Sequence, residues 1–508
     1  MEALLLAMML TTDIVKSYRR TDVCAVLNGF PSQVAYQLGL WDLDHPPPVS
    51  YHAVCVQIQR LEKALGATWT STSESVRDLA WLCHTLIDTS IPRKDRKMIK
   101  AITFDSKVIE SWGVSKTYMK EKDALAEHRL KERERADLDE PDLPTITEPV
   151  TNEIGTFGPD GRLIRSHDPD ARLTYKTGTN REKARIVLGY DLHLASAVPE
   201  VKWAGNPTKL AVGKALPRFI TAMILAPGAT NPGPIGLDLV AKSKRIASEI
   251  KEVIADRGYT NKRKTFCRDL HKQGINVVMD YNPKELETAK TVDVGRNGKQ
   301  QLFLHAGQFF PPWLTDDLLV ESEGLTGDKL DKWYADRACW RWTVHRYLDD
   351  GSVQLICPQC AGRVKTSAKT RNPSPPKKKP LPSLHIDDEY CCDGTVTVPV
   401  DQLDSFQRIP PKTPAWTDSY KGRRNTSENK NSMLGGKGNF ALEWCRVFNM
   451  MAFTLGSLMK VIKHNLEEAT RFLRNQPQHP KPITETEPSD PPHDETQPTS
   501  DESPRAPP

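Results

Sequence analysis

The chain has 508 residues, of which 38% are hydrophobic and 27% are charged. At about 150 residues per domain, this length predicts roughly three domains and more than one sizeable core. No apolar stretch approaches the ~20 residues that span a bilayer, and the apolar start from Met1 to Leu6 lacks a basic segment, so we expect a helix there rather than a signal peptide. These features argue against a membrane protein and against a secreted one.

The charge is unevenly distributed along the chain. Lys and Arg number 70 against 65 Asp and Glu, which gives a net charge of +5. Residues 476–508 contain two basic and seven acidic residues, so the rest of the chain carries the basic excess. A moderately basic body favours a nucleic-acid partner, and the acidic, proline-rich tail over 475–508 is predicted to be disordered.

Residues 1–95 are predicted to be a helical, DNA-binding domain. Ser32 is the expected N-cap of a short helix that ends at Gly39. Ser50 is expected to cap a second helix, whose apolar residues recur at helical spacing. These apolar residues are Val54, Val56, Ile58, Leu61 and Leu65. The pair is compatible with a helix-turn-helix and equally with an ordinary helical bundle.

An α/β segment is predicted over residues 96–289. The expected strands are 99–109, 186–195, 218–225, 253–256 and 275–279, and the expected helices are 115–135, 235–251 and 260–273. The helix between the last two strands implies that these strands are parallel. A β-rich insertion is predicted over 290–405, and helices return over 406–474.

Two aspartates of the predicted sheet are candidate catalytic residues. Asp105 lies part-way along its strand, and Asp256 ends a strand just before Gly258, at the carboxyl edge where α/β proteins bind ligands. An isolated Asp there is more often a cap or an ion-pair partner. However, Glu428 lies in a basic helical segment, and a helix placed over the sheet edge would complete a carboxylate site for two Mg²⁺ ions.

Two further acids compete for the same role. We interpret Asp191 as an outward-facing or edge-strand residue. Asp238 is interpreted as a charge in the first turn of a helix, where it would favour the helix dipole.

Several short motifs, taken as an ordered set, resemble bacterial DDE-type insertion-sequence transposases. Residues 255–259 (Ala-Asp-Arg-Gly-Tyr) match one family segment, and residues 189–195 are similar to its Gly-Tyr-Lys-x-His-x-Ala strand, with Asp191 at the Lys position. Residues 166–178 also fit. The family's Tyr-Arg-Glu-Lys signature is matched by Tyr420, Arg424, Glu428 and Lys437. The resemblance covers about residues 99–285 and 410–465.

The resemblance implies a ribonuclease-H-like catalytic core, here a mixed sheet flanked by helices. Its acidic triad would be Asp105, Asp256 and Glu428, which would hold Mg²⁺ or Mn²⁺. Such enzymes cut transposon ends and join the freed 3′-hydroxyl to target DNA, which implies DNA as partner, a homodimer on DNA and a nucleoid-associated location in the bacterial cytoplasm.

The resemblance also implies which residues contact transposon-end DNA. They are Tyr420, an arginine and Lys437. Arg423 has the family spacing from Tyr420, whereas Arg424 has the spacing to Glu428, so both arginines remain candidates; Lys437 falls two residues late.

Two other functions remain open. One is a catalytically inactive, transposase-derived DNA-binding protein or regulator, which the departures around Lys437 and Asp105 allow. The other is a ribonuclease-H-like nuclease that cleaves DNA without joining it.

The cysteines predict a zinc site in the insertion. Cys357 and Cys360 form a Cys-x-x-Cys pair with a proline inside and Gly362 just after, which suits tetrahedral thiolate binding. Cys391 and Cys392 would supply the other two ligands, and His385 is an alternative to one of them. The other cysteines are too scattered for a disulfide scaffold, which favours a reducing compartment.

Overall fold

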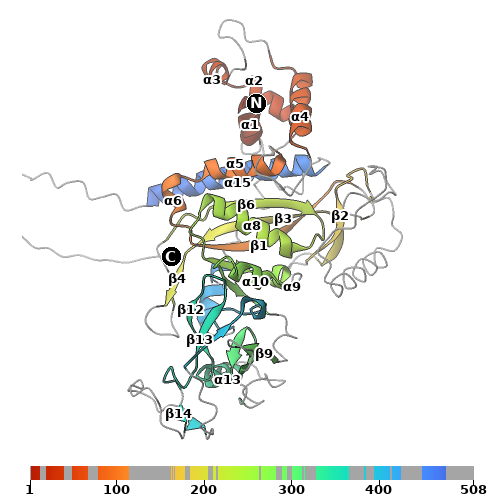
Figure 1. Cartoon of the computed structure of the whole chain (residues 1–508). Coiled ribbons are helices and arrows are strands. Elements are labelled where there is room, and N and C mark those ends of the chain that lie inside the picture. The colour runs from red at the N-terminus through yellow and green to blue at the C-terminus, as the bar shows by residue number, and fades with distance from the viewer. Residues whose placement is uncertain are drawn as a thin grey trace, which may run out of the picture.

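The structure is a computed structural model (Figure 1). It describes residues 2–11, 19–38, 40, 48–66, 78–113, 162, 164, 166–177, 183–203, 210–212, 215–261, 265–281, 289–294, 300–311, 314, 328–363, 365–366, 383–384, 394–411, 413, 415–420, 422–424 and 449–475. Several predictions fall outside these residues. They are the 115–135 helix, the tail after Asn475, Gly39, His385, Cys391, Cys392, Glu428 and Lys437.

The described part of residues 1–95 is helical, as the sequence predicts. The helices are α1 (Glu2–Leu10), α2 (Arg20–Asn28), α3 (Ser32–Gln37), α4 (Tyr51–Leu65), α5 (Leu79–Ser90) and α6 (Arg93–Arg96). Ser50 caps α4 as expected, because its side chain accepts a hydrogen bond from the Ala53 amide at 3.1 Å. Ser32 is the first helical residue rather than the cap, since Pro31 occupies the N-cap position.

A mixed sheet forms the centre of the molecule. Its strands are β1 (Ala101–Glu110), β2 (Arg172–Lys176), β3 (Arg185–Val198), β6 (Ile220–Pro227), β7 (Glu252–Ala255) and β8 (Asn276–Met279). The order is β2-β3-β1-β7-β8, and β6 also pairs with β3. β3 is antiparallel to β1, β2 and β6, whereas β7 is parallel to both β1 and β8. The predicted parallel pair is therefore confirmed.

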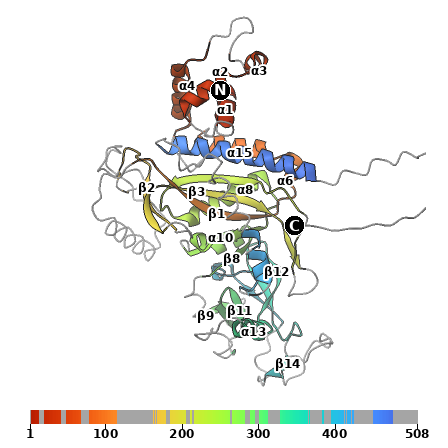
Figure 2. The ribbon, with the colours of Figure 1, turned by 180° about the vertical axis from the view of Figure 1, so that it is seen from behind.

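Helices cover this sheet. α5 and α15 (Met450–Asn475) pack on each other and on β6, and Figures 1 and 2 show them on one side of the sheet, with α10 (Phe266–His271) on the other. α8 (Pro232–Ile246) packs against β6 and β3. β6 is buried along its whole length, as expected for a strand with neighbours on both faces. The predicted fold class, a mixed sheet flanked by helices, is confirmed at this level.

Two predicted helices have different bounds. α8 begins at Pro232 rather than at residue 235, because the Asn231 side chain accepts a hydrogen bond from the Gly233 amide at 3.1 Å, and it ends at Ile246 rather than at residue 251. The helix expected over 260–273 is two short helices, α9 (Arg257–Asn261) and α10. The chain then turns at Gly274 with a φ of 69°, a conformation that favours glycine.

Polar contacts attach α15 to the sheet. The Asn465 side chain accepts from the Ile220 amide at 2.8 Å and donates to the Ile220 carbonyl at 2.9 Å. The same amide group donates to the Ser90 hydroxyl at the end of α5. Just before the start of α15, the Asn449 amide donates to the buried Asp168 carboxylate, which also accepts from the Tyr190 hydroxyl. Residues far away in the sequence thus hold α15 at its start and part-way along its length.

The described part of residues 290–405 is β-rich and has a core of its own. β9 (Lys290–Val294), β10 (Gln300–His305) and β11 (Gln308–Phe310) form one antiparallel sheet, and β12 (Thr343–Tyr347), β13 (Val353–Ile356) and β16 (Thr395–Val398) form another. The other described elements of this region are α13 (Asp328–Ala338), β14 (Lys365–Thr366), β15 (Ser383–Leu384) and η3 (Val400–Gln402). Outside it, β4 (Val201–Trp203) and β5 (Leu210–Val212) form an antiparallel pair.

None of the described helices has the length and hydropathy that a bilayer crossing requires.

Candidate active site at the carboxyl edge of the sheet

The sheet brings Asp105 and Asp256 to the same level of neighbouring strands. β1 and β7 are parallel, and their ladder pairs Thr103 with Ile254. Two residues farther along each strand stand Asp105 and Asp256. Adjacent strands lie about 4.8 Å apart, and residues at one level of a parallel ladder face the same side. The two aspartates that the sequence singled out therefore lie side by side, with Asp256 at the carboxyl end of β7 and Asp105 midway along β1.

A third aspartate, which the sequence analysis missed, follows on the next strand. β7 and β8 are parallel and pair Ala255 with Met279, so Asp256 and Asp280 stand at the same level. The Asp280 carboxylate lies 3.6 Å from Nε of Arg257. The sequence does contain a signal for Asp280, because β7 and β8 are both short apolar runs that end directly before an aspartate.

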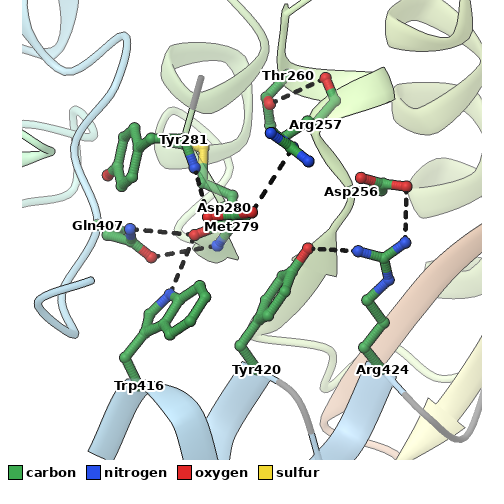
Figure 3. Close-up of polar contacts among 10 residues, drawn as sticks. All are labelled: Asp256, Arg257, Thr260, Met279, Asp280, Tyr281, Gln407, Trp416, Tyr420 and Arg424. Carbon is green, nitrogen blue, oxygen red and sulfur yellow. Dashed lines mark hydrogen bonds and ion pairs between the residues drawn. The ribbon is translucent and has the colours of Figure 1, made fainter. Parts of the chain in front are cut away.

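A helical segment over 415–420 and 422–424 packs across this edge (Figure 3). Trp416 and Tyr420 lie one helical turn apart, and their rings stack with centroids 4.6 Å apart. The Trp416 indole donates a hydrogen bond to the Met279 carbonyl at 3.1 Å. Both side chains are almost fully buried, with 3% and 4% of their surface exposed. This packing fixes the segment on the ends of β7 and β8.

Arg424, one further turn along, reaches the candidate acids. Its guanidinium donates to the Asp256 carboxylate and to the Tyr420 hydroxyl, each at 2.9 Å. Burial tends to lower the pKa of Arg424, but the Asp256 carboxylate, the Tyr420 hydroxyl and the Asp105 carboxylate together raise its pKa overall. Burial raises the pKa of Tyr420 to about 12, so its hydroxyl stays protonated. Arg424 is therefore a permanent positive charge beside both aspartates.

The two arginines that the sequence left as alternatives lie in different places. Arg423 is buried and pairs with Glu252, the first residue of β7, and with Ser419. Asp256 follows the last residue of β7, so Arg423 and Arg424 reach opposite ends of one strand. Of the two, the structure places Arg424 at the candidate site. Tyr420, the other described candidate for DNA contact, lies in the core beneath Arg424.

Neutral groups lie beneath the acids. Nδ1 of His193 on β3 forms a 2.9 Å hydrogen bond with the Tyr259 hydroxyl, and both side chains are buried. Burial lowers the pKa of His193 to about 3, so its ring is uncharged. Burial, together with the negative charges of Asp105 and Asp256, raises the pKa of Tyr259 far above its usual value. This contact also joins the two sequence motifs, since His193 lies in 189–195 and Tyr259 in 255–259.

The interpretations of the two competing acids were wrong. Asp191 is half-buried and does not lie on an edge strand, because β3 pairs there with Val108 of β1 on one side and with Ala226 of β6 on the other. Its carboxylate accepts from the Ala229 amide at 2.8 Å and the Thr174 hydroxyl at 3.3 Å, and burial raises its pKa to about 6. Asp238 lies in the second turn of α8, since this helix starts early, and pairs with Lys242 at 2.6 Å.

The sheet edge supplies some of the oxygen ligands that a hard divalent cation needs. Asp105 and Asp256 supply carboxylate oxygens, which Mg²⁺ and Mn²⁺ prefer. Within the described ranges, no three His, Cys, Asp or Glu side chains gather closely enough to hold a metal ion. The third acid predicted from the sequence, Glu428, lies outside these ranges.

The Cys-x-x-Cys pair forms a tight turn after β13. The Cys357 amide donates to the Gly394 carbonyl at 3.1 Å, and the Gly362 amide donates to the Gln359 carbonyl at 2.9 Å. Gly362 has a φ of 67°, which allows the chain to reverse. Cys392 stands only two residues before Gly394, within ~7 Å of chain at full extension. Gly394, two residues after Cys392 in the sequence, thus lies against the Cys-x-x-Cys turn.

No known protein-family model matches the chain, and no curated protein is significantly similar to it.

Proposed function

We propose that the protein is a DNA transposase that cleaves transposon ends and joins them to target DNA in a metal-dependent reaction. The observation that carries the proposal is the alignment of Asp105 and Asp256 on neighbouring parallel strands, with Arg424 beside them. The contact between His193 and Tyr259 supports it, because it joins two motifs that resemble the transposase family. Such an enzyme would act on DNA in the bacterial cytoplasm, at the nucleoid.

The sheet topology supports a ribonuclease-H-like core. Three antiparallel strands, β6, β3 and β1, are followed in space by the parallel strands β7 and β8, and α8 connects β6 to β7. This is the mixed sheet that the family resemblance implies. The aspartates stand within β1 and directly after β7, where strands from both halves of the sheet meet.

The residues of the site have distinct proposed roles. Asp105 and Asp256, completed by Glu428, would hold Mg²⁺ or Mn²⁺, which activates a water or 3′-hydroxyl and stabilises the leaving oxygen. Arg424 would bind the phosphate that reacts, since a guanidinium forms paired hydrogen bonds to phosphate oxygens. Tyr420 orients Arg424 by accepting one of its hydrogen bonds. The uncharged His193 leaves the acids free of a competing positive charge beneath them.

The proposal is tested with the full chain and labelled DNA that carries the inverted repeats flanking its coding region. We expect cleavage at the repeat ends in Mg²⁺ or Mn²⁺ and a joined product when target plasmid is added, but no cleavage of DNA with scrambled ends. Cleavage without joining would instead identify a nuclease, and end binding without cleavage would identify a regulator. Because two ends are brought together in such reactions, the active form on DNA is proposed to be a homodimer.

We also propose a structural zinc ion in the β-rich insertion. Cys357 and Cys360 would supply two thiolates from the turn after β13, and Cys391 and Cys392, or His385 in place of one, would supply the rest. Four-coordinate zinc of this kind stabilises small β structures that have a limited core.

Elemental analysis should find roughly one zinc per chain, and Cys357→Ser should lose most of it, because thiolates dominate zinc affinity. The matched control is Cys339→Ser in the same insertion, whose thiol donates to the Asp336 carbonyl and which should retain its zinc. Full zinc content in Cys357→Ser would contradict the site.

A further inference from the structure

The C-terminal half of α15 has an uncovered apolar surface. Although most of this helix is buried, Leu466 and Leu473 have 46% and 49% of their surface exposed. They lie seven residues apart, and therefore on the same face of the helix. α1 packs on α15, as Figures 1 and 2 show, and its last residues lie beside this face. An exposed apolar strip next to a second helix is a candidate contact surface.

A groove with a volume of about 720 Å³ lies between the two helices. Its apolar lining comes from Met9 and Leu10 of α1 and from Leu466 of α15. The charged side chains that line it are Lys463, Arg471, Arg474 and Glu467. The groove thus combines an apolar lining with an excess of positive charge.

The cations of the groove are only partly neutralised. Lys463 lies 3.5 Å from Glu467, and Arg471 lies 2.5 Å from Glu468. The Arg471 side chain is nevertheless 56% exposed, so much of it remains accessible. Arg474 forms no ion pair with any residue in the described part of the chain. The charge complement of this groove is therefore an acidic segment.

The sequence that follows α15 has the matching chemistry. Asn475, the last residue of the helix, itself lines the groove. Residues 476–508 contain seven acidic and two basic residues. Ile483 is their only large apolar residue, and Glu485 and Glu487 follow it closely. One apolar side chain beside two acids suits an apolar groove with basic residues along it.

The connection is long enough for this segment to reach the groove. Leu466 lies nine residues before Asn475, about 14 Å along the helix at 1.5 Å per residue. Ile483 stands eight residues after Asn475, which allows up to about 26 Å of extended chain. Ile483 can therefore return to Leu466. Glu485 would then stand beside Lys463, one helical turn farther along.

We infer that residues 476–508 dock in the groove between α1 and α15, with Ile483 against its apolar lining and Glu485 at Lys463. Duplex DNA would meet the basic side chains, but its sugar-phosphate backbone offers no apolar group to the lining. The tail also has the advantage of its tether, since a short linker gives an effective concentration on the order of millimolar. This docking does not depend on the proposed function.

The first test treats the full chain with a carbodiimide, which joins a carboxylate directly to a nearby amine, and identifies the products by mass spectrometry. The Lys463–Glu467 pair, at 3.5 Å, is the internal reference. We expect a second cross-link from Lys463 to Glu485. In Ile483→Ser its initial rate should fall roughly tenfold relative to the reference, because the buried apolar contact is lost. Ala506→Ser, elsewhere in the tail, is the matched control and should keep the rate.

The second test changes the groove instead of the tail. Leu466→Ser alters a side chain that is 46% exposed, so the helix should stay folded, and the Lys463–Glu485 cross-link should become rarer as in Ile483→Ser. The double variant should fall no further than either single variant, because both remove the same contact. Independent, additive losses would contradict a contact between Ile483 and Leu466.

Three results would overturn the docking of the tail on its own chain. One is a Lys463–Glu485 cross-link that is absent, or equally fast in Ile483→Ser, while the Lys463–Glu467 reference forms. Another is a cross-link that joins labelled to unlabelled chains in a mixture of ¹⁵N-labelled and unlabelled protein, which would identify a second copy as the occupant. The third is protection of Lys463 from acetylation by duplex DNA without any tail cross-link, which would identify DNA. None of these measurements requires cleavage, so they remain decisive if the proposed activity is absent.

Discussion

Asp256→Asn should abolish metal-dependent cleavage, with the rate falling roughly 10³-fold or more. A metal ion contributes several kcal/mol of charge stabilisation to phosphoryl transfer, and each 1.36 kcal/mol corresponds to a factor of about ten in rate. Asn retains the size of Asp and an oxygen that accepts from Arg424, so the local packing should survive. DNA affinity should stay within about twofold, because most of that affinity comes from phosphate contacts elsewhere.

The matched control is Asp280→Asn, one strand away at the same level of the sheet. Its carboxylate pairs with Arg257, so we expect cleavage within about tenfold of the wild-type rate. Calorimetric titration with Mn²⁺ gives a readout that does not depend on turnover: Asp105→Asn and Asp256→Asn should both weaken binding, and Asp280→Asn should not. A cleavage rate near wild type for Asp256→Asn would remove it from the catalytic site.

Arg423→Gln should mainly lower the stability of the protein, whereas Arg424→Gln should mainly change its metal affinity, although the two residues are neighbours in the sequence. Arg423 is 5% exposed and its partner Glu252 is 19% exposed, so its loss leaves a largely buried carboxylate unpaired. We expect the free energy of unfolding to fall by roughly 3 kcal/mol, with little change in Mn²⁺ affinity. Arg424 is 25% exposed and contributes less to stability.

Arg424→Gln should instead change the metal site. The guanidinium bound to Asp256 competes with a cation for the same oxygens, so its removal should tighten Mn²⁺ binding roughly three- to tenfold. Cleavage should nevertheless fall, since a phosphate contact is lost. Denaturant titration and calorimetry separate the two variants. Equal loss of stability in both, with no change in Mn²⁺ affinity for Arg424→Gln, would contradict these roles.

Much of the sheet was predictable because its strands are apolar runs bounded by turns. β3, β6, β7 and β8 lie within a few residues of the predicted ranges, and Asp256, predicted as the last residue of its strand, directly follows β7. The parallel pairing of β7 and β8 followed from the helical connection predicted between them and its length. Helix bounds were less accurate where a polar cap or a short break decides them, as with Asn231 before α8 and the split between α9 and α10.

The details of the site required tertiary structure. Consecutive helical residues point about 100° apart, so the sequence gives no reason to prefer Arg423 or Arg424 until the sheet lies beneath the helix. Asp191 was misplaced because the pairing of β3 on both sides depends on strands far away in the chain. Asp280 follows an apolar run as Asp256 does, but it was missed because only the pairing of β7 with β8 shows that the two aspartates stand at the same level.

The attachment of α15 has a consequence for biosynthesis. Asn465 bonds to Ile220 across 245 positions of sequence, so the sheet acquires this covering helix only after nearly all of the described chain has left the ribosome. Contacts of such long range slow folding, because the loop between them must close first. Until then β6 lacks one of its coverings, and an uncovered apolar strand invites association with other chains. Nascent protein should therefore depend on chaperones until synthesis is complete.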